Sequence, residues 1–299
     1  MREFRRHLMD NLLLLHEDLA NKQYVHGGYH SFRICDPKPR HIHKANVRDR
    51  LLHHAIYRIL YPFFDRTFIG DSYSCRIDKG THRALNRFRA MAYQVSRNHT
   101  RTFWVLKCDI RKFFASIEHE VLLQLLRGYI PDQDMMWLLE RVVKSFSTYG
   151  TPGVGLPLGN LTSQLFSNIY MNEFDRFVKH YLKAQYYIRY ADDFVFLHED
   201  KAWLEAQIPM IGQFLTKRLC LTLHPKKVTI STFASGVDFL GWVHFTDHRV
   251  LRETTKRRMM RRVRECQKEE TVQSYLGLLS HGNARKLRNE VLQEYWVWK

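Results

Sequence analysis

The chain has 299 residues, of which 45% are hydrophobic and 26% are charged. This composition excludes a disordered chain and allows one large domain or two smaller ones. The 47 basic residues outnumber the 30 acidic residues, and the resulting net charge of +17 indicates a polyanionic partner.

The charge is unevenly distributed along the chain. Residues 1–107 hold 20 basic and 9 acidic residues, residues 108–200 hold 9 and 12, residues 201–250 hold 6 and 3, and residues 251–299 hold 12 and 6. We therefore expect an acidic centre suited to divalent cations between basic flanks suited to phosphates.

The five cysteines lack CxxC or Cys/His zinc spacing, which favours a reduced cytoplasmic setting without a disulfide framework. No run of about 18 apolar residues occurs anywhere in the chain, so we expect no membrane span. The expected protein is cytoplasmic and has no membrane partner.

The front of the chain predicts three helices. Apolar residues recur at helical spacing over residues 4–19, and further helices are predicted from Asp49 in DRLLHHAIYRILYPFF and from Thr81 in THRALNRFRAMAYQVS. The segment before Asp49 reads as a looser one. Its turn signals are Asp36, Pro37 and Pro39.

The centre of the chain mixes strands and helices. TFWVLKCDI predicts a strand that ends on Asp109, and YYIRY and FVFL predict two strands joined at ADD. Helices are expected around HEVLLQLLRGY, PDQDMMWLLERVVKSF and LTSQLFSNIYMNEFDRFVKHYL, and near residues 202–219. Short strands are expected around LTLHPKKVTI and VDFLGWVHF, before a basic helical tail from residue 252.

Asp192 and Asp193 interrupt an aromatic and β-branched run, where unpaired carboxylates are costly to bury. Two strands that end on carboxylates can lie side by side and bring Asp109 to this pair. Oxygen ligands of this kind select Mg²⁺, with Mn²⁺ as a substitute, and two ions about 3.5 to 4 Å apart serve nucleotidyl transfer in polymerases. The alternative is an ordinary surface turn, which is the commoner setting of an Asp-Asp pair.

Eight blocks of sequence then carry a resemblance to a known family. They are KPRHIHKANVRDRLLHHAI, DSYSCRIDKGTHRAL, KCDIRKFFASI, GLPLGNLTSQLFSNIYMNEFD, YIRYADDFVF, LTLHPKKV, DFLGW and SYLGLLSHGNARKL. In these blocks the chain resembles the reverse transcriptases, in particular the group that drives diversity-generating retroelements in bacteria, archaea and phages.

The resemblance implies an α+β, right-hand polymerase fold with fingers, an antiparallel palm and a short helical thumb. The expected division is a basic N-terminal segment with fingers at 1–107, a palm at 108–238 that is partly interleaved with fingers, a primer-grip hairpin at 239–251 and a thumb at 252–299.

The resemblance also implies roles for the acidic residues. Asp109 and Asp192 match the ligands of both metal ions, the Ile110 peptide oxygen is a further ligand, and Asp193 is the neighbouring, less direct carboxylate. Lys227 resembles the lysine proposed to protonate the leaving pyrophosphate, and the adjacent Lys226 competes for this role.

Further residues match positions that contact the incoming nucleotide. Arg76 and Lys79 match basic positions that grip the triphosphate, with a solvated loop as the alternative. Phe114 matches the position that rejects a 2′-hydroxyl, although Phe113 or Phe114 can be ordinary core.

The block GLPLGNLTSQ carries the subtype. Leu158 stands where many reverse transcriptases have Gln, and Ser163-Gln164 replaces Ser-Pro. Leu158 offers only apolar contact near the nascent pair, so we expect reduced fidelity. The resemblance implies that errors concentrate at template adenines.

The end of the chain matches the parts that hold the primer and duplex. Trp242 is expected either to stack on the primer or to pack in the core. The primer-grip residues are Phe239, Leu240, Gly241 and Trp242, and the basic thumb residues expected on the nucleic-acid backbone are Lys256, Arg257, Arg258, Arg261 and Arg262.

The implied partners are a structured template RNA, a primer with its cDNA, dNTPs and a basic accessory variability protein. A reverse transcriptase of the retron or phage-defence kind is the alternative within the enzyme class. An RNA-binding scaffold that retains an inactive polymerase fold is the alternative outside it.

Overall fold

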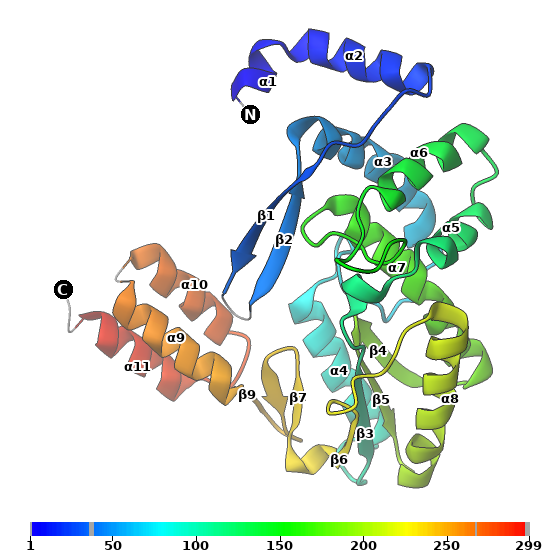
Figure 1. Cartoon of the computed structure of the whole chain (residues 1–299). Helices are drawn as coiled ribbons and strands as arrows, with labels where there is room; N and C mark the ends of the chain where they lie inside the picture. Colours follow the sequence, from blue (N-terminus) through cyan, green and yellow to red (C-terminus); the bar gives the residue numbers. More distant parts are fainter. Residues whose placement is uncertain (1, 36–38, 267, 297–299) are drawn as a thin grey trace.

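The computed structural model describes residues 2–35, 39–266 and 268–296 (Figure 1). A four-stranded antiparallel sheet forms its centre, with strand order β4-β5-β3-β6. These strands are β3 (Trp104–Asp109), β4 (Tyr186–Tyr190), β5 (Asp193–His198) and β6 (Thr229–Thr232). Helices pack around this sheet, which confirms the α+β class.

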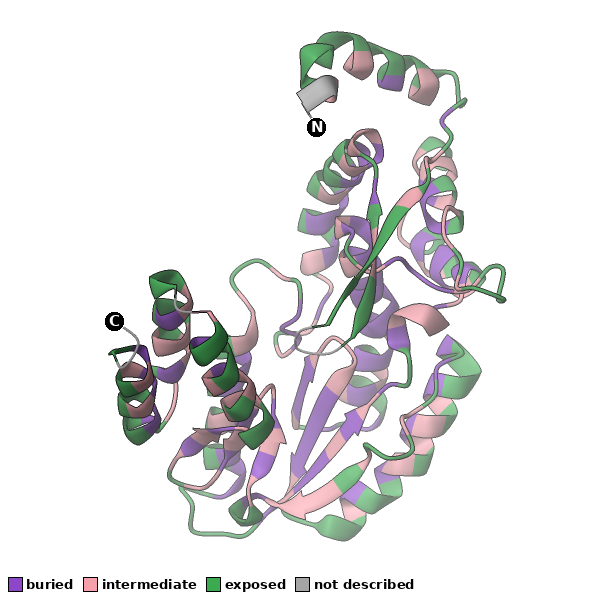
Figure 2. Ribbon diagram, turned by 60° about the vertical axis from the view of Figure 1, so that its left-hand side comes forward, coloured by how far each residue is buried: buried purple, intermediate pink, exposed green. Residues whose placement is uncertain are grey.

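Strands β3, β4 and β5 each contribute to two hydrophobic clusters, because alternate side chains point to opposite faces. Leu106 and Phe194 pack in the larger cluster and Val105 and Val195 in the other. Figure 2 shows buried residues along the inner strands of this sheet and on the helices that pack against them. Helices that pack in the larger cluster are α3 (Val47–Asp65), α5 (His119–Arg127), α6 (Gln133–Lys144), α7 (Leu161–Arg176) and α8 (Lys201–Leu219); α4 (Thr81–Val95) packs in the other.

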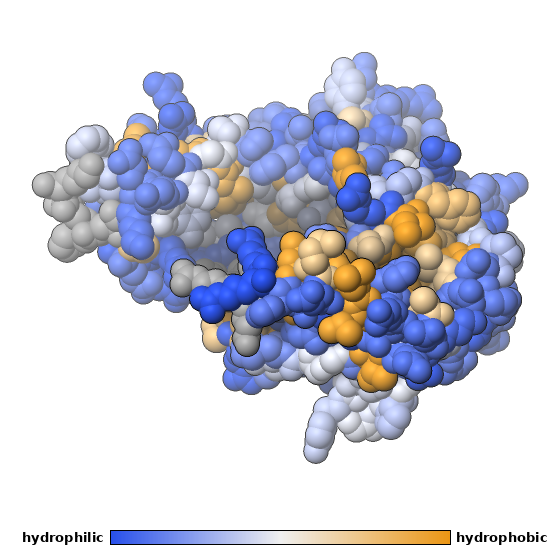
Figure 3. Space-filling model, turned by 90° about the horizontal axis from the view of Figure 1, so that it is seen from above, coloured by the Kyte–Doolittle hydropathy of each residue, from blue (hydrophilic) through white to orange (hydrophobic). Residues whose placement is uncertain are grey.

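The predicted first helix is divided at His7 into α1 (Arg2–Arg6) and α2 (Leu8–Ala20). Leu15 is the buried residue of α2, whereas four other apolar side chains lie exposed. Figure 3 looks down on this end of the molecule and shows apolar surface gathered there. The four exposed apolar side chains of α2 are Leu8, Met9, Leu13 and Leu14.

The segment expected to be loose forms a β-hairpin, so that interpretation was wrong. Strand β1 (Tyr29–Ile34) pairs antiparallel with β2 (Arg40–Ala45). Both strands are mostly exposed, so the sequence lacks the apolar alternation that marks a half-buried strand. Of the three turn signals, Pro39 directly precedes β2, whereas Asp36 and Pro37 lie outside the described residues.

The C-terminal part begins with a three-stranded sheet of β7 (Val237–Phe239), β8 (Trp242–His244) and β9 (Arg249–Leu251). Strand β9 was not predicted, and the strand expected around LTLHPKKVTI is confined to Thr229–Thr232. The tail that was expected to be helical from residue 252 forms α9 (Glu253–Glu265), α10 (Glu269–Leu279) and α11 (Arg285–Trp296).

The loop between α10 and α11 packs tightly against this sheet. A Cβ atom on Gly282 would lie 2.0 Å from the Trp242 ring, and Asn283 N–H donates to the Arg249 carbonyl at 2.9 Å. The rings of His281 and His82 of α4 stack with centroids 3.6 Å apart. The helical end is therefore joined both to the sheet and to α4.

A buried polar cluster joins the N-terminal segment to α3. Asp49 accepts hydrogen bonds from Tyr24 Oη at 2.8 Å and from Gly27 N at 2.9 Å, and the Nε2 atoms of His26 and His53 lie 3.2 Å apart. Burial and, secondarily, the nearby charge of His26 lower the pKa of His53 to about 4. No helix in the described ranges has the length and apolar character of a membrane span.

This cluster predicts acid lability. Because the pKa of His53 is lowered on folding, its contribution to stability is present above its ordinary value of 6.5 and is lost as the pH falls toward 4. We expect the free energy of unfolding to fall by about 2 kcal/mol more in the wild type than in His53→Gln between about pH 7.5 and about pH 5, measured by urea denaturation. His54→Gln, an exposed neighbour, is the control and should retain the wild-type loss.

Candidate active site

The antiparallel pairing of β3 with β5 brings the separated acids together. Asp109 at the end of β3 lies opposite Asp193, the first residue of β5. Asp192 occupies the turn between β4 and β5, and its carbonyl accepts a hydrogen bond from Ile110 N at 3.2 Å. Ala191, directly before it, has the left-handed φ of +55°. The three predicted carboxylates therefore lie at one edge of the central sheet.

Burial destabilises the charged form of two of these carboxylates. Burial chiefly raises the pKa of Asp193 to about 6, and the Asp109 and Asp192 charges raise it further while Lys107 opposes them. Burial and the Asp109 charge raise the pKa of Asp192, which Lys227 and Arg40 of β2 lower. The site thus holds crowded negative charge of the kind that attracts cations.

Two lysines face the acids. Lys227 Nζ lies 2.9 Å from both carboxylate oxygens of Asp109, because the backbone around His224 is held beside β3. Lys226 is exposed, and its backbone N–H donates to His224 Nδ1 at 3.3 Å. Of the two candidates for the general acid, Lys227 is the one that the fold directs to the carboxylates.

Lys107 faces the third acid from the same strand as Asp109. Its Nζ lies 3.7 Å from Asp193 Oδ2 and donates to the Asp238 carbonyl at 2.7 Å. Lys107 therefore connects Asp193 to strand β7. The sequence contained a signal for this residue, because Lys107 and Asp109 are two positions apart and share one face of the strand.

The donor chemistry at this edge suits a hard divalent cation. The side chains of Asp109 and Asp192 and the peptide oxygen of Ile110 are all oxygen donors, and the buried Oδ1 of Asp193 has no hydrogen-bond partner. Over residues 2–35, 39–266 and 268–296, no three His, Cys, Asp or Glu side chains are grouped to hold an ion. Mg²⁺ is commonly held by one or two carboxylates plus substrate phosphates rather than by an all-protein cage.

Phe114, which is predicted to reject a 2′-hydroxyl, lies five residues after Asp109 and packs against the hydrophobic core. Phe113 is buried, whereas Phe114 is half-buried against the same cluster, with ring centroids 5.3 Å apart. The Phe114 carbonyl accepts a hydrogen bond from Leu156 N at 2.8 Å. Phe113 is thus the core residue of the pair, and Phe114 remains the predicted steric residue.

The segment around Leu158 holds the β1–β2 hairpin. The Leu158 carbonyl accepts a hydrogen bond from His43 N at 2.8 Å, and Asn160 bonds the backbone of Ala45 and of His43 at 3.1 and 2.7 Å. The side chains of Leu158 and of Gln164, on the first turn of α7, are partly exposed. Their nucleotide contacts remain predictions.

The two basic residues expected to grip the triphosphate have intramolecular partners. The Arg76 side chain is 6% exposed and donates to Asp65 Oδ1 and to the Ile69 carbonyl, each at 2.7 Å. Lys79 Nζ donates to the Gly70 carbonyl at 2.7 Å. Arg76 therefore shapes the loop that presents Lys79, and the phosphate contacts of both residues remain predictions.

The predicted primer-grip residues form the β7–β8 turn. Phe239 and Trp242 are buried, and Leu240 and Gly241 form the turn with φ of +49° and +89°. The Trp242 ring packs against the loop at Gly282 and under the Arg249 guanidinium, whose central carbon lies 5.7 Å from the ring centroid. This is the packing alternative for Trp242, and the accessible part of the hairpin is its tip.

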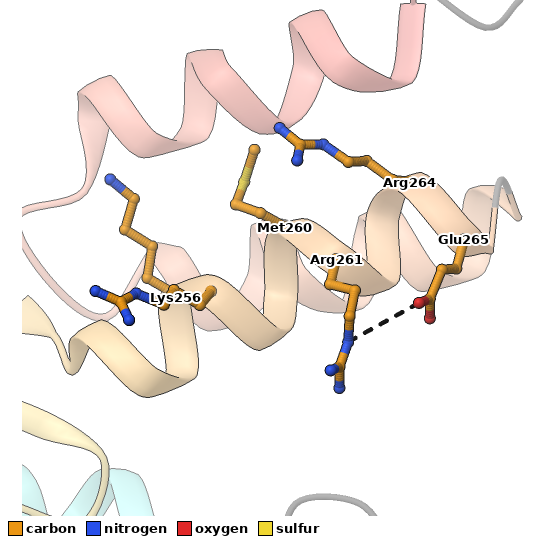
Figure 4. A pocket seen from close by; sticks show the side chains of 6 residues that line it. Lys256, Met260, Arg261, Arg264 and Glu265 are labelled. Carbon is orange, nitrogen blue, oxygen red and sulfur yellow. Dashed lines mark ion pairs between the residues drawn. The ribbon is translucent and has the colours of Figure 1, made fainter.

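Helix α9 carries the predicted basic thumb residues, and three of them, Lys256, Arg257 and Arg261, line a hollow on the helix (Figure 4). Arg257 and Arg261 are exposed and pair with Glu253 and Glu265 one turn away, at 2.9 and 3.9 Å. Exposed pairs of this kind are weak, so these guanidinium groups can readily change partners, and their contacts with the nucleic-acid backbone remain predictions. Arg262 is also exposed, whereas Lys256 and Arg258 are half-buried.

The chain is similar to known proteins in sequence and in fold. The sequence profile of the family "Reverse transcriptase (RNA-dependent DNA polymerase)" matches residues 35–244. The chain belongs to the reverse transcriptase family. A relative of this chain is Protein YkfC of Escherichia coli K12, 28% identical over 252 residues, which cover 72% of the chain and 64% of YkfC.

Another relative is the group II intron-encoded protein LtrA of Lactococcus lactis, which is 24% identical over 283 residues, with 70% of the chain and 44% of LtrA covered. The chain thus spans less than two thirds of either relative. Apo telomerase from Candida tropicalis has a similar fold, with a TM-score of 0.55 at 12% identity over 82% of the chain and 60% of the telomerase chain. The right-hand polymerase fold is therefore confirmed.

The lysine geometry predicts different effects of two adjacent substitutions. We expect Lys227→Met to lower the rate of single-nucleotide incorporation by about 10² to 10⁴-fold, the usual contribution of a general acid. Lys226→Met is the matched control and should leave the rate unchanged. Rapid-quench primer extension measures the rate, and equal behaviour of the two variants would exclude Lys227 as the acid.

Proposed function

We propose that this reverse transcriptase is an RNA-directed DNA polymerase that copies an RNA template into cDNA with two Mg²⁺ ions. The observation that carries the proposal is the position of Asp109 opposite Asp193, with Asp192 in the adjoining turn. Family membership over residues 35–244 supports the reaction type, and the net charge of +17 suits a nucleic-acid partner.

In this proposal the residues of the chain have separate tasks. Asp109 and Asp192 hold the metal ions, which when bound activate the primer hydroxyl and stabilise the leaving pyrophosphate. Asp109 orients Lys227, whose ammonium group donates the proton to pyrophosphate. Lys107 offsets the charge of Asp193, so this third, less direct carboxylate can remain near the metal ions.

The proposed subtype is the diversity-generating one. Two positions of the amino-acid sequence support this subtype. Leu158 replaces a polar residue beside the nascent pair, and Gln164 follows Ser163 in place of proline. The proposed template is a structured repeat RNA, and the proposed protein partner is a basic accessory variability protein. Helix α9, with its exposed arginines, is the proposed contact for the duplex backbone.

The two other candidates differ from this proposal, one in the RNA that it copies and the other in having no catalytic activity. A retron or phage-defence enzyme would use the same acids on a different RNA, and the flanking genes distinguish it by the presence of a template repeat beside a variable target gene. A non-catalytic scaffold would have no need for the crowded acids or for Lys227 beside Asp109. Primer extension with Mg²⁺ separates the scaffold from both enzymes.

The metal proposal is tested by a neutral substitution. Asp192→Asn removes a ligand charge while retaining shape, so we expect primer-extension activity to be lost. The melting temperature should stay the same or rise, because burial and the Asp109 charge disfavour the charged form of Asp192. Asp200→Asn is the control, because Asp200 caps α8 through Ala202 N at 2.8 Å and Asn caps equally well. An Asp192→Asn enzyme with full activity would remove the site assignment.

The fidelity proposal is tested at the residue that replaces the polar group. We expect Leu158→Gln to reduce misincorporation opposite template adenines, because an amide can hydrogen-bond the nucleotide or template beside the nascent pair. Deep sequencing of cDNA made from an adenine-containing RNA measures the error at each base. Leu14→Gln, on the exposed face of α2, is the control, and an identical error spectrum in all three enzymes would contradict the proposal.

A further inference from the structure

Beneath the acidic turn lies an ion pair that is completely buried. The side chains of Arg189 in β4 and Asp175 in α7 are both 0% exposed. Arg189 Nε donates to Asp175 Oδ1 at 2.8 Å and Nη2 donates to Oδ2 at 2.6 Å, so the pair is bidentate. Tyr187 Oη donates to Asp175 Oδ1 at 2.7 Å and completes the pairing of the carboxylate.

The remaining contacts of this guanidinium join three further groups. Nη2 donates to Ser72 Oγ at 3.1 Å, and Nη1 donates to Asn168 Oδ1 at 3.4 Å and to the Ala191 carbonyl at 3.1 Å. A guanidinium has five N–H donors, and all five directions are used here. Such a fully satisfied network is rigid and requires the planar fork of arginine.

The contact with Ala191 has a direct consequence for Asp192. The Ala191 carbonyl belongs to the peptide group that precedes Asp192, and the Asp192 carbonyl is bonded by Ile110 N at 3.2 Å. Both peptide groups that flank Asp192 are therefore held, one by Arg189 and the other by Ile110, which directly follows β3. Ala191 has a left-handed φ of +55°, which a non-glycine residue adopts only when its surroundings impose it.

We infer that Arg189 is a positioning residue that orients Asp192 toward Asp109 for metal binding. The inference rests on the proposed metal role of Asp192. Arg189 acts through the Ala191 peptide and touches neither carboxylate of the site. Groups that orient metal ligands typically change metal affinity or activity by about 10- to 100-fold when they are removed.

The alternative is that the ion pair only stabilises the fold, and Arg189→Lys distinguishes the two. Lysine retains the charge beside Asp175 but cannot hold both the carboxylate and the Ala191 carbonyl. We expect the affinity of the free Arg189→Lys protein for Mn²⁺, measured by electron paramagnetic resonance, to fall about 10-fold or more. The Mg²⁺ concentration that primer extension requires should rise by a similar factor. The KM for dNTP should not change.

The matched control is Arg87→Lys. Arg87 also forms a bidentate pair, with Asp71 at 2.8 and 3.3 Å, but it does not bond the turn. Its Mn²⁺ affinity should equal that of the wild type. A folded Arg189→Lys protein that behaves like this control overturns the inference.

A second variant decides the question if Arg189→Lys fails to fold. Replacing a buried ion pair by apolar residues of similar volume often preserves stability, so Arg189→Met/Asp175→Leu/Tyr187→Phe should fold. A positioning role predicts the same loss of Mn²⁺ affinity in this triple variant, whereas a purely structural role predicts wild-type affinity. Asp192→Asn separates the two proposals. If Asp192→Asn also leaves the Mn²⁺ affinity unchanged, the proposed metal site itself is wrong. If Asp192→Asn weakens Mn²⁺ binding but the Arg189 variants do not, only the inference on Arg189 is wrong.

Discussion

The site depends on the register of two strands, β3 and β5. In this register Asp109 faces Asp193, and Leu106 and Val105 point to opposite clusters of the core. A shift by one residue would exchange every side chain between the two faces, so the packing of both clusters opposes it. The burial of apolar residues thereby fixes the arrangement of the acids, although the acids themselves repel each other.

Lysines offset that repulsion at the surface of the site, and an ion pair beneath them holds the acidic turn. At the surface of the site, Lys227 and Lys107 lie beside Asp109 and Asp193, which lowers the electrostatic cost of holding these charges together. Below it, Arg189 and Asp175 neutralise each other out of contact with solvent. Because buried ion pairs contribute little net stability, the lower pair is better explained by the geometry it imposes on the turn than by its energy.

The sequence predicted elements that have a strong periodic pattern or a turn signal. The strand ending on Asp109 and the two strands around ADD formed as expected, because their apolar runs are buried on both faces. The β1–β2 hairpin was missed since its exposed strands carry no such pattern. The partners of Lys107 and Arg189 could not be predicted, because their contacts with Asp238 and Asp175 depend on how separate elements pack.

The close approach of Gly282 to the Trp242 ring affects how the C-terminal helices can move. With no space for even a methyl group between them, and with His281 stacked on His82, this loop cannot slide along the β7–β8 hairpin. Any movement of the two helices that flank this loop, α10 and α11, must carry the hairpin with it. In the proposed complex, the primer end and the duplex backbone would therefore meet surfaces whose relative position is fixed.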